Sequence, residues 1–271
     1  MLITEMRNPN TMNITEMSTA EMMRAMQEEN RRAAAAIDEV LPEIGEAVDR
    51  ISERMKRGGR LFYIGCGTSG RLGVLDASEC PPTYGVPKDL VIGIIAGGDH
   101  ALRNAIEGAE DDAELGAQTI AEYNITELDS LIGISVAGGA KFVIGAMEYA
   151  KAKGALVISL ASNPDTPIER IADVAISPIT GPEVITGSTR MKAGTAHKMI
   201  LNMISTAVMI RQGHVYENLM INLRPSNVKL RARMIRIVND ILGCGEKEAE
   251  RLLSENGFII KNALRAGGRS V

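Results

Sequence analysis

The sequence predicts an α/β fold, a doubly wound sheet of five parallel strands, and two observations carry this prediction. Five short apolar runs lack the alternation of half-exposed strands, which is typical of strands buried on both faces. A helix-like or glycine-containing segment separates each pair of runs, and this alternation is typical of βαβ units. The runs are residues 61–66, 90–96, 131–136, 156–161 and 174–179.

The elements before and after these runs are predicted to be helices. An arm without periodicity runs to about Thr15, and Ser18 with Glu21 forms a capping box that opens the first helix. Pro42 begins a second helix, which Gly58-Gly59 ends. Further helices are expected at 193–211, 226–242 and 246–254. We therefore predict N-terminal arm and helices at 1–50, a ligand-binding domain at 51–214 and a helical C-terminal segment at 215–271.

The composition narrows the class of protein. The 271 residues are 45% hydrophobic and 24% charged, which is typical of a globular chain, and with no Trp and three Phe its core must be aliphatic. A net charge of -4 argues against nucleic-acid binding. No apolar run approaches the ~18 residues of a membrane span, and no signal peptide opens the chain. Cys66, Cys80 and Cys244 form no metal-ligand or disulfide spacing, so we expect a cytoplasmic location.

The loop after the first run is the strongest candidate site, because ligands of open α/β sheets bind at the carboxyl ends of the strands. Residues 65–71 combine three glycines with the hydroxyls of Thr68 and Ser69 before a helix. Glycines let the backbone approach an anion, and the helix start offers free N–H groups, so we predict a phosphate cradle. A plain glycine-rich turn is the alternative. Neither the dinucleotide fingerprint nor the P-loop ending is present.

Three further segments are weaker candidates. Pro81-Pro82 is expected to stop the helix around Glu79, which leaves a carboxylate at a helix end, although a solvated acid is the more common reading of a lone Glu. Residues 137–141 can form a second backbone nest for an anion, with a simple turn as the alternative. Residues 181–195 place hydroxyls, a cation and glycines before a long helix. The residues alone predict an α/β protein that binds a small phosphorylated ligand, and they leave its reaction open.

The string from Gly65 to Gly85 strongly resembles N-acetylmuramic acid 6-phosphate etherases. The likeness begins in the arm at Arg7 and runs to about Cys244. Other stretches that look like the same family are residues 107–111, 186–196, 201–203, 213–216, 218–220 and 227–230.

The resemblance implies a sugar isomerase (SIS) fold, an intracellular homodimer, and cleavage of the lactyl ether of N-acetylmuramic acid 6-phosphate. It implies no metal or organic cofactor. Matched motif to motif, Glu79 corresponds to the acid that protonates lactate and Glu110 to the base at C2 of the sugar. The candidate substrate-binding residues are Gly67, Thr68, Ser69, Gly70, Ser78, Gly138, Gly139, Ser188, Thr189 and Lys192.

Two departures from the family accompany the resemblance. Relatives usually carry Ser-Gly-Arg-Thr-Pro where this chain has Ala137-Gly138-Gly139-Ala140-Lys141, and the tail is expected to be shorter than theirs. A non-catalytic phosphosugar-binding regulator, like the related glucokinase regulatory protein, is the first alternative to an etherase. A phosphosugar isomerase of the same fold is the second.

Overall fold

The computed structural model describes residues 1–223, 225 and 228–269. These residues form two compact units. The first comprises 1–77 and 89–208, and the second comprises 78–88 and 209–271. The predicted boundaries at residues 50 and 214 stay predictions.

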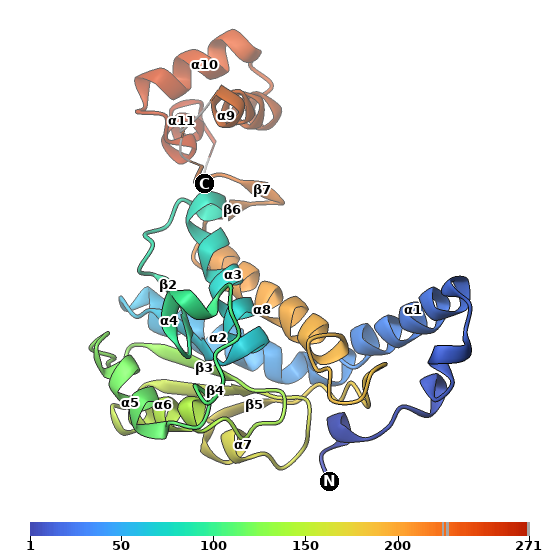
Figure 1. Ribbon diagram of the computed structural model, residues 1–271. Coiled ribbons are helices and arrows are strands. Elements are labelled where there is room, and N and C mark those ends of the chain that lie inside the picture. The colour runs from blue at the N-terminus through green and yellow to red at the C-terminus, as the bar shows by residue number, and fades with distance from the viewer. Residues whose placement is uncertain (224, 226–227, 270–271) are drawn as a thin grey trace. The chain divides into compact units, whose positions relative to one another are not determined.

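The first unit is built on a five-stranded parallel sheet, as predicted (Figure 1). The strands are β1 (Leu61–Gly65), β2 (Val91–Ile95), β3 (Ser130–Ile134), β4 (Leu156–Leu160) and β5 (Val174–Ile176). Their order is β2-β1-β3-β4-β5, and every neighbouring pair is parallel. The chain reverses its direction across the sheet between β1 and β3. In such folds the crevice at this switch point is the usual ligand site.

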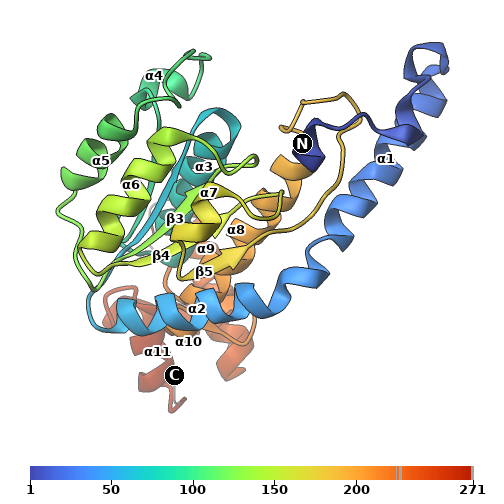
Figure 2. The ribbon, with the colours of Figure 1, turned by 90° about the horizontal axis from the view of Figure 1, so that it is seen from below.

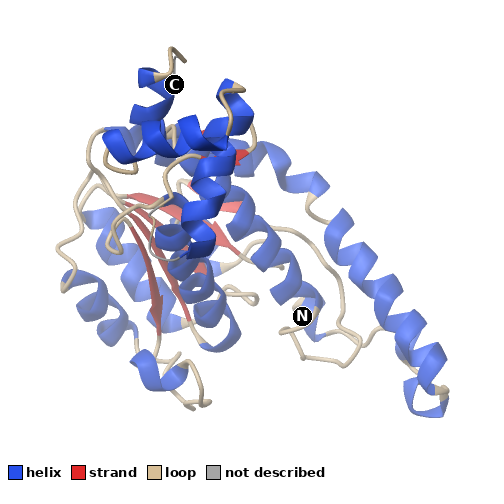
Figure 3. Cartoon of the chain, turned by 90° about the horizontal axis from the view of Figure 1, so that it is seen from above, coloured by secondary structure: helices blue, strands red, loops and turns tan. Residues whose placement is uncertain are grey.

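Helices cover both faces of the sheet, which explains why β1, β3 and β4 are buried along their whole length (Figure 3). One face carries α5 (Ala113–Ala121), α6 (Lys141–Ala152) and α7 (Pro167–Ile171). The other carries α2 (Leu41–Lys56) and the first-unit parts of α3 (Gly67–Tyr84) and α8 (Lys192–Arg211). The short α4 (Gly98–Ala101) follows β2.

Helix α3 packs directly against the sheet because glycines in its first turns leave room for this contact. A Cβ on Gly70 would lie 2.6 Å from the carbonyl oxygen of Gly65 and 2.7 Å from Ile95 Cγ1. Gly67 begins the helix with a φ of 51°, in the left-handed region that favours glycine. Close packing of α3 on β1 and β2 therefore requires glycine at position 70.

A buried carboxylate fixes α3 further along. Asp76 of α3 accepts hydrogen bonds from the Tyr63 hydroxyl at 2.9 Å, from Asn202 Nδ2 at 2.6 Å and from the Ser205 hydroxyl at 3.1 Å. Burial raises the pKa of Asp76, and these donors oppose the shift. The contacts join α3 to both β1 and α8.

The expectation that Pro81-Pro82 stop this helix at Glu79 is wrong, because α3 continues to Tyr84. The prolines remove N–H groups that would bond the carbonyls four residues earlier, but both sit in the last turns. The Gly85 N–H still donates to the Pro81 carbonyl at 2.9 Å, so the final turn is closed.

The N-terminal arm consists of three short 3-10 turns, Ile3–Glu5, Pro9–Thr11 and Ile14–Glu16. Helix α1 (Thr19–Ala35) follows, and the predicted capping box of Ser18 and Glu21 is confirmed. A fourth 3-10 turn, Asp38–Val40, leads into α2. The predicted start of α2 near Pro42 is also confirmed.

The second unit has its own apolar core. It contains the hairpin of β6 (Val215–Tyr216) and β7 (Leu219–Met220), followed by α9 (Val228–Leu242), α10 (Glu246–Glu255) and α11 (Ile260–Ala266). The two predicted C-terminal helices are confirmed, although the proposed start at Ser226 lies outside the described residues. The hairpin and α11 were not predicted. Among described residues, no helix is long and apolar enough to cross a membrane.

His197 of α8 is fully buried, and its Nε2 lies 3.0 Å from the Ser162 hydroxyl, just after β4. Burial lowers the pKa of His197 to about 4, and a hydrogen bond with the Ala161 backbone opposes this shift only in part. The imidazole is therefore neutral in the folded protein at ordinary pH.

This burial predicts that His197 weakens the fold in acid. The unfolded chain protonates this imidazole below its ordinary pKa of about 6.5, whereas the folded protein leaves it neutral until pH is about 4. In that window the unfolded state binds more protons than the folded state. The free energy of unfolding therefore decreases as the pH is lowered, by about 3 kcal/mol in total. Urea unfolding across this range should show His197→Asn losing this dependence and the exposed His100→Asn keeping it. Equal slopes for wild type and His197→Asn would contradict the prediction.

Candidate functional site

A cavity of about 260 Å³ lies at the carboxyl edge of the sheet, at the switch point between β1 and β3. We call it the cradle cavity. The loops after β1 and β3, the segment before α5 and the start of α8 contribute to its wall. Its lining residues are Cys66, Gly67, Thr68, Ser69, Glu110, Ile134, Ser135, Val136, Ala137, Ala140, Thr189 and Gly194.

The N-terminus of α3 supplies one side of the cradle cavity. Gly67, Thr68 and Ser69 form its first turn, whose N–H groups have no partner within the helix. Such a turn favours an anion through these donors and through the helix dipole. The hydroxyls of Thr68 and Ser69 add two further possible donors. The predicted cradle residues therefore line a cavity, as a phosphate site requires.

Two other helices begin near the cavity, and some of their first-turn donors are already used. In α8, the N–H groups of Lys192 and Ala193 donate to the Glu183 carboxylate at 2.9 and 3.0 Å. In α6, the N–H of Phe142 donates to the carbonyl of Glu110 at 3.0 Å. The turn of α3 is therefore the better place for an anion.

Glu110 is the acidic residue of the cradle cavity. Its side chain is exposed, and its backbone carbonyl is fixed by the bond from Phe142. Glu110 also lines an adjoining cavity of about 360 Å³, which shares Cys66 and Gly67 with the first. The predicted base thus lines both cavities at the strand ends.

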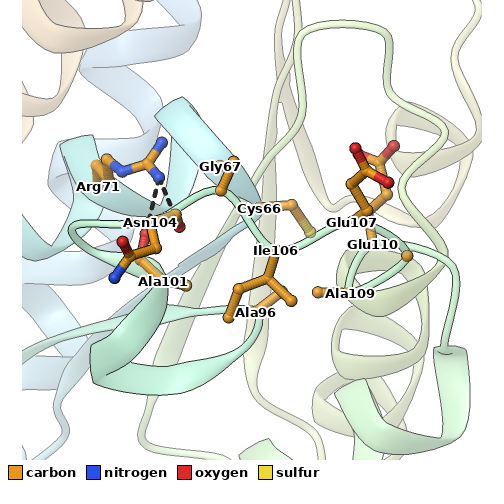
Figure 4. Close-up of a pocket in the computed structure, with 12 residues that line it drawn as sticks. Cys66, Gly67, Arg71, Ala96, Ala101, Asn104, Ile106, Glu107, Ala109 and Glu110 are labelled. Carbon is orange, nitrogen blue, oxygen red and sulfur yellow. Dashed lines mark hydrogen bonds between the residues drawn. The ribbon is translucent and has the colours of Figure 1, made fainter.

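Arg71 organises the wall of the adjoining cavity (Figure 4). Its guanidinium donates to the carbonyls of Ala101, Leu102 and Asn104 at 2.8, 3.0 and 3.2 Å. These bonds tie α3 to the segment that leads toward Glu110. The charge of Arg71 is therefore used on backbone carbonyls in this structure.

Cys66 forms part of both cavities, and its thiol stays protonated at neutral pH. Burial raises the pKa of Cys66 to about 12, with smaller contributions from the charges of Glu110 and Asp111. A neutral thiol is a poor nucleophile, so the structure gives Cys66 no covalent role.

The loop after β3, residues 137–141, does not offer all the backbone donors that an anion nest would need. The N–H of Gly138 donates to the Ser135 carbonyl at 2.9 Å, so it is engaged within the turn. A Cβ on Gly138 would lie 2.2 Å from the Thr166 side chain, and its φ is 69°, so glycine is needed here for the turn itself. Gly139 is exposed and does not line the cradle cavity, whereas Ala137 and Ala140 do.

The loop before α8 is only partly as predicted. Thr189 lines the cradle cavity, but Ser188 does not. Lys192 is 2% exposed, and its ammonium forms an ion pair with Glu29 of α1. In this structure the ammonium of Lys192 is therefore engaged by Glu29 and is not free to bind a ligand. Gly70 likewise lies against the sheet instead of lining the cavity.

Ser78 and Glu79 are exposed residues of α3 that belong to the second unit. Glu79 lies twelve positions after Gly67 on α3, and it does not line the cradle cavity. Glu79 is therefore not part of the first turn of α3.

Sequence reasoning missed two buried acids, Glu183 and Glu29. Glu183 caps α8, and Glu29 neutralises Lys192. Their signals were weak, because Glu183 lies in an irregular loop and Glu29 in a polar helix. Within the described part of the chain, no group of three His, Cys, Asp or Glu residues could hold a metal ion.

Comparisons with known proteins decide the family. The chain is 57% identical over 263 residues to the N-acetylmuramic acid 6-phosphate etherase of Caldanaerobacter subterraneus subsp. tengcongensis, covering 97% of this chain and 86% of that protein. It is 51% identical to the etherase of Serratia proteamaculans, covering 97% and 89%. The chain belongs to the N-acetylmuramic acid 6-phosphate etherase family.

Family models and solved structures agree with the predicted SIS fold. A model of the glucokinase regulatory protein N-terminal SIS domain matches residues 43–151, and a SIS domain model matches 106–207. A phosphoheptose isomerase from Francisella tularensis superposes with a TM-score of 0.57 at 17% identity, covering 71% of this chain and 98% of that one. One from Neisseria gonorrhoeae gives 0.54 at 18%, covering 72% and 100%. These two structures show the fold alone.

Proposed function

We propose that this chain is a carbon–oxygen lyase that removes the lactyl ether of N-acetylmuramic acid 6-phosphate. The products are N-acetylglucosamine 6-phosphate and D-lactate. The family supports the substrate, since relatives at 57 and 51% identity carry the etherase name. The observation that carries the proposal is that Glu110 lines the same cavity as the anion-binding turn of α3.

The phosphate of the substrate binds at the first turn of α3 in this proposal. The N–H groups of that turn and the hydroxyls of Thr68 and Ser69 provide the donors, and Thr189 also lines the cavity. A sugar held in this way extends toward Glu110. Residues 51–214 then act as the phosphosugar-binding domain.

Glu110 acts as the base. When the sugar opens to its aldehyde, the proton on C2 becomes acidic, and the Glu110 carboxylate removes it. The electron pair forms the C2–C3 double bond as the C3–oxygen bond of the ether breaks.

Glu79 acts as the acid that protonates the departing ether oxygen, and D-lactate leaves. Water then adds its oxygen to C3 and a proton to C2, which completes N-acetylglucosamine 6-phosphate. Because Glu79 is not among the residues that line the cradle cavity, we propose that a second copy of the chain supplies this acid to the site. The homodimer is thus part of the proposed mechanism.

The relatives do not favour the alternative of a non-catalytic regulator. A regulator and an etherase would both bind a phosphosugar, but only an etherase releases lactate. A cytoplasmic location accords with a substrate that carries phosphate.

The two carboxylates should fail in different ways. Glu110→Gln should lower both lactate release and C2 proton exchange by about 10²–10⁴-fold, because the base is lost. Glu79→Gln should abolish lactate release yet still allow C2 exchange. Lactate is measured enzymatically and exchange by NMR in deuterium oxide. The exposed Glu114→Gln on α5 is the control and should match wild type. Exchange that survives in Glu110→Gln would refute its role as base.

Mixing the two inactive variants tests whether Glu79 acts across the dimer. Random pairing makes half of the dimers mixed, and each mixed dimer has one intact site if the acid comes from the other copy. Co-refolded Glu79→Gln and Glu110→Gln should then recover about a quarter of wild-type activity. No recovery in a confirmed mixed dimer would place both acids on one chain.

Restoring side-chain donors in the second loop should tighten phosphate binding. Ala137 and Ala140 line the cradle cavity, so the double variant Ala137→Ser with Ala140→Thr offers two hydroxyls to the ligand. Calorimetric titration with N-acetylglucosamine 6-phosphate should show at least about tenfold tighter binding, the value of one charge-assisted bond. Unphosphorylated N-acetylglucosamine should show no gain. Unchanged affinity for both sugars would mean that the loop does not touch phosphate.

A further inference from the structure

The N-terminal arm, residues 3–16, has polar side chains that are buried. Thr4 is 0%, Asn8 4% and Thr11 5% exposed, although the arm lacks the periodicity of a packed element. Buried polar groups need partners, because an unpaired one costs free energy. Their partners show what the arm is attached to.

Asn8 and Thr11 bind the loop that leads into α8 (Figure 2). Asn8 Nδ2 donates to the Pro182 carbonyl at 3.1 Å, and the Thr11 hydroxyl donates to the Val184 carbonyl at 2.9 Å. These two carbonyls flank Glu183. The arm is therefore hydrogen-bonded to the chain on both sides of Glu183, the residue that caps α8.

Glu183 in turn contacts the segment that forms part of the wall of the cradle cavity. The Glu183 carboxylate accepts the N–H groups of Lys192 and Ala193, and so fixes the start of α8. Thr189 and Gly194, on either side of these donors, line the cavity. The position of this wall thus depends on the segment that the arm holds.

Thr4 makes a second attachment, to the loop after β4. Its N–H donates to Asn163 Oδ1 at 3.3 Å, and Asn163 Nδ2 donates to the Thr4 hydroxyl at 3.0 Å. The same amide donates to the carbonyl of Val136, which also lines the cavity, at 2.9 Å. The arm therefore braces the cavity wall at two separated places.

We propose that the N-terminal arm is a positioning element of the phosphosugar site, an inference that rests on the proposed function. Asn8, Thr11 and Thr4 do not touch the ligand. They hold the wall formed by Val136, Thr189 and Gly194 in the binding-competent arrangement. Without these bonds, the wall is ordered in only a fraction of the ligand-free molecules. The apparent affinity is then the intrinsic affinity multiplied by that fraction.

Thr11 offers the sharpest test, because valine keeps its size and removes its hydroxyl. Thr11→Val and Asn8→Ala should each raise KM for N-acetylmuramic acid 6-phosphate and Kd for N-acetylglucosamine 6-phosphate about five- to tenfold, as for the loss of one hydrogen bond. Once substrate is bound the wall is ordered, so kcat should change less than about twofold. Thr11→Ser keeps the donor and should restore wild-type values. The exposed arm residue Asn13, changed to Ala, is the matched control.

Hydrogen exchange of the ligand-free protein supplies a readout that needs no activity. Amides of residues 181–191 should exchange faster in Thr11→Val than in Asn13→Ala. Wild-type Kd and KM in Thr11→Val, or unchanged exchange in this segment, would overturn the inference, even if its melting temperature drops. Wild-type protein that neither binds nor cleaves the phosphosugars would instead contradict the proposed function, and the exchange comparison would still decide whether the arm braces the wall.

Discussion

The direct contact between α3 and the strands β1 and β2 is the constraint on which the candidate site depends. At Gly70 the helix meets the carbonyl of Gly65 and the side chain of Ile95 with no room for a Cβ. A Cβ on Gly93 of β2 would likewise lie 2.4 Å from Val74 Cα of the helix. This contact sets where the first turn of α3 points, and hence where its N–H groups meet the cradle cavity. Asp76 reinforces the same placement from β1 and α8.

The site built on this contact relies more on the backbone than on charged side chains. Two cations near the cavity are used elsewhere, Arg71 on loop carbonyls and Lys192 on Glu29. One N–H of the first turn of α6 donates to Glu110, and two N–H groups of the first turn of α8 donate to Glu183. The first turn of α3 lines the cradle cavity, and in our proposal it binds the phosphate. Main-chain donors need no particular side chain, which explains how this family member can carry alanines in its second loop.

The sheet and the first cradle could be predicted from sequence because both follow from local patterns. Buried parallel strands give apolar runs, and a strand followed by glycines, hydroxyls and a helix gives Gly67 to Ser69. Contacts between distant segments left no such pattern. Lys192 resembled a ligand-binding cation, and nothing local showed that Glu29 neutralises it. Gly138 resembled a phosphate donor, although its N–H closes a turn onto Ser135. The arm had no periodicity, and its buried contacts depend on the tertiary fold alone.

The most direct test of this account is the affinity of Gly70→Ala for N-acetylglucosamine 6-phosphate, measured by calorimetry on protein that circular dichroism shows to be folded. A methyl group at this position must push α3 away from the sheet, so the account predicts binding weakened at least about tenfold, the effect of losing one charge-assisted bond. Gly45→Ala on α2 is the matched control, because a Cβ there meets nothing within 4 Å. It should bind as tightly as wild type and be slightly more stable. A folded Gly70→Ala protein with wild-type affinity would contradict the claim that close packing of α3 on the sheet builds the site.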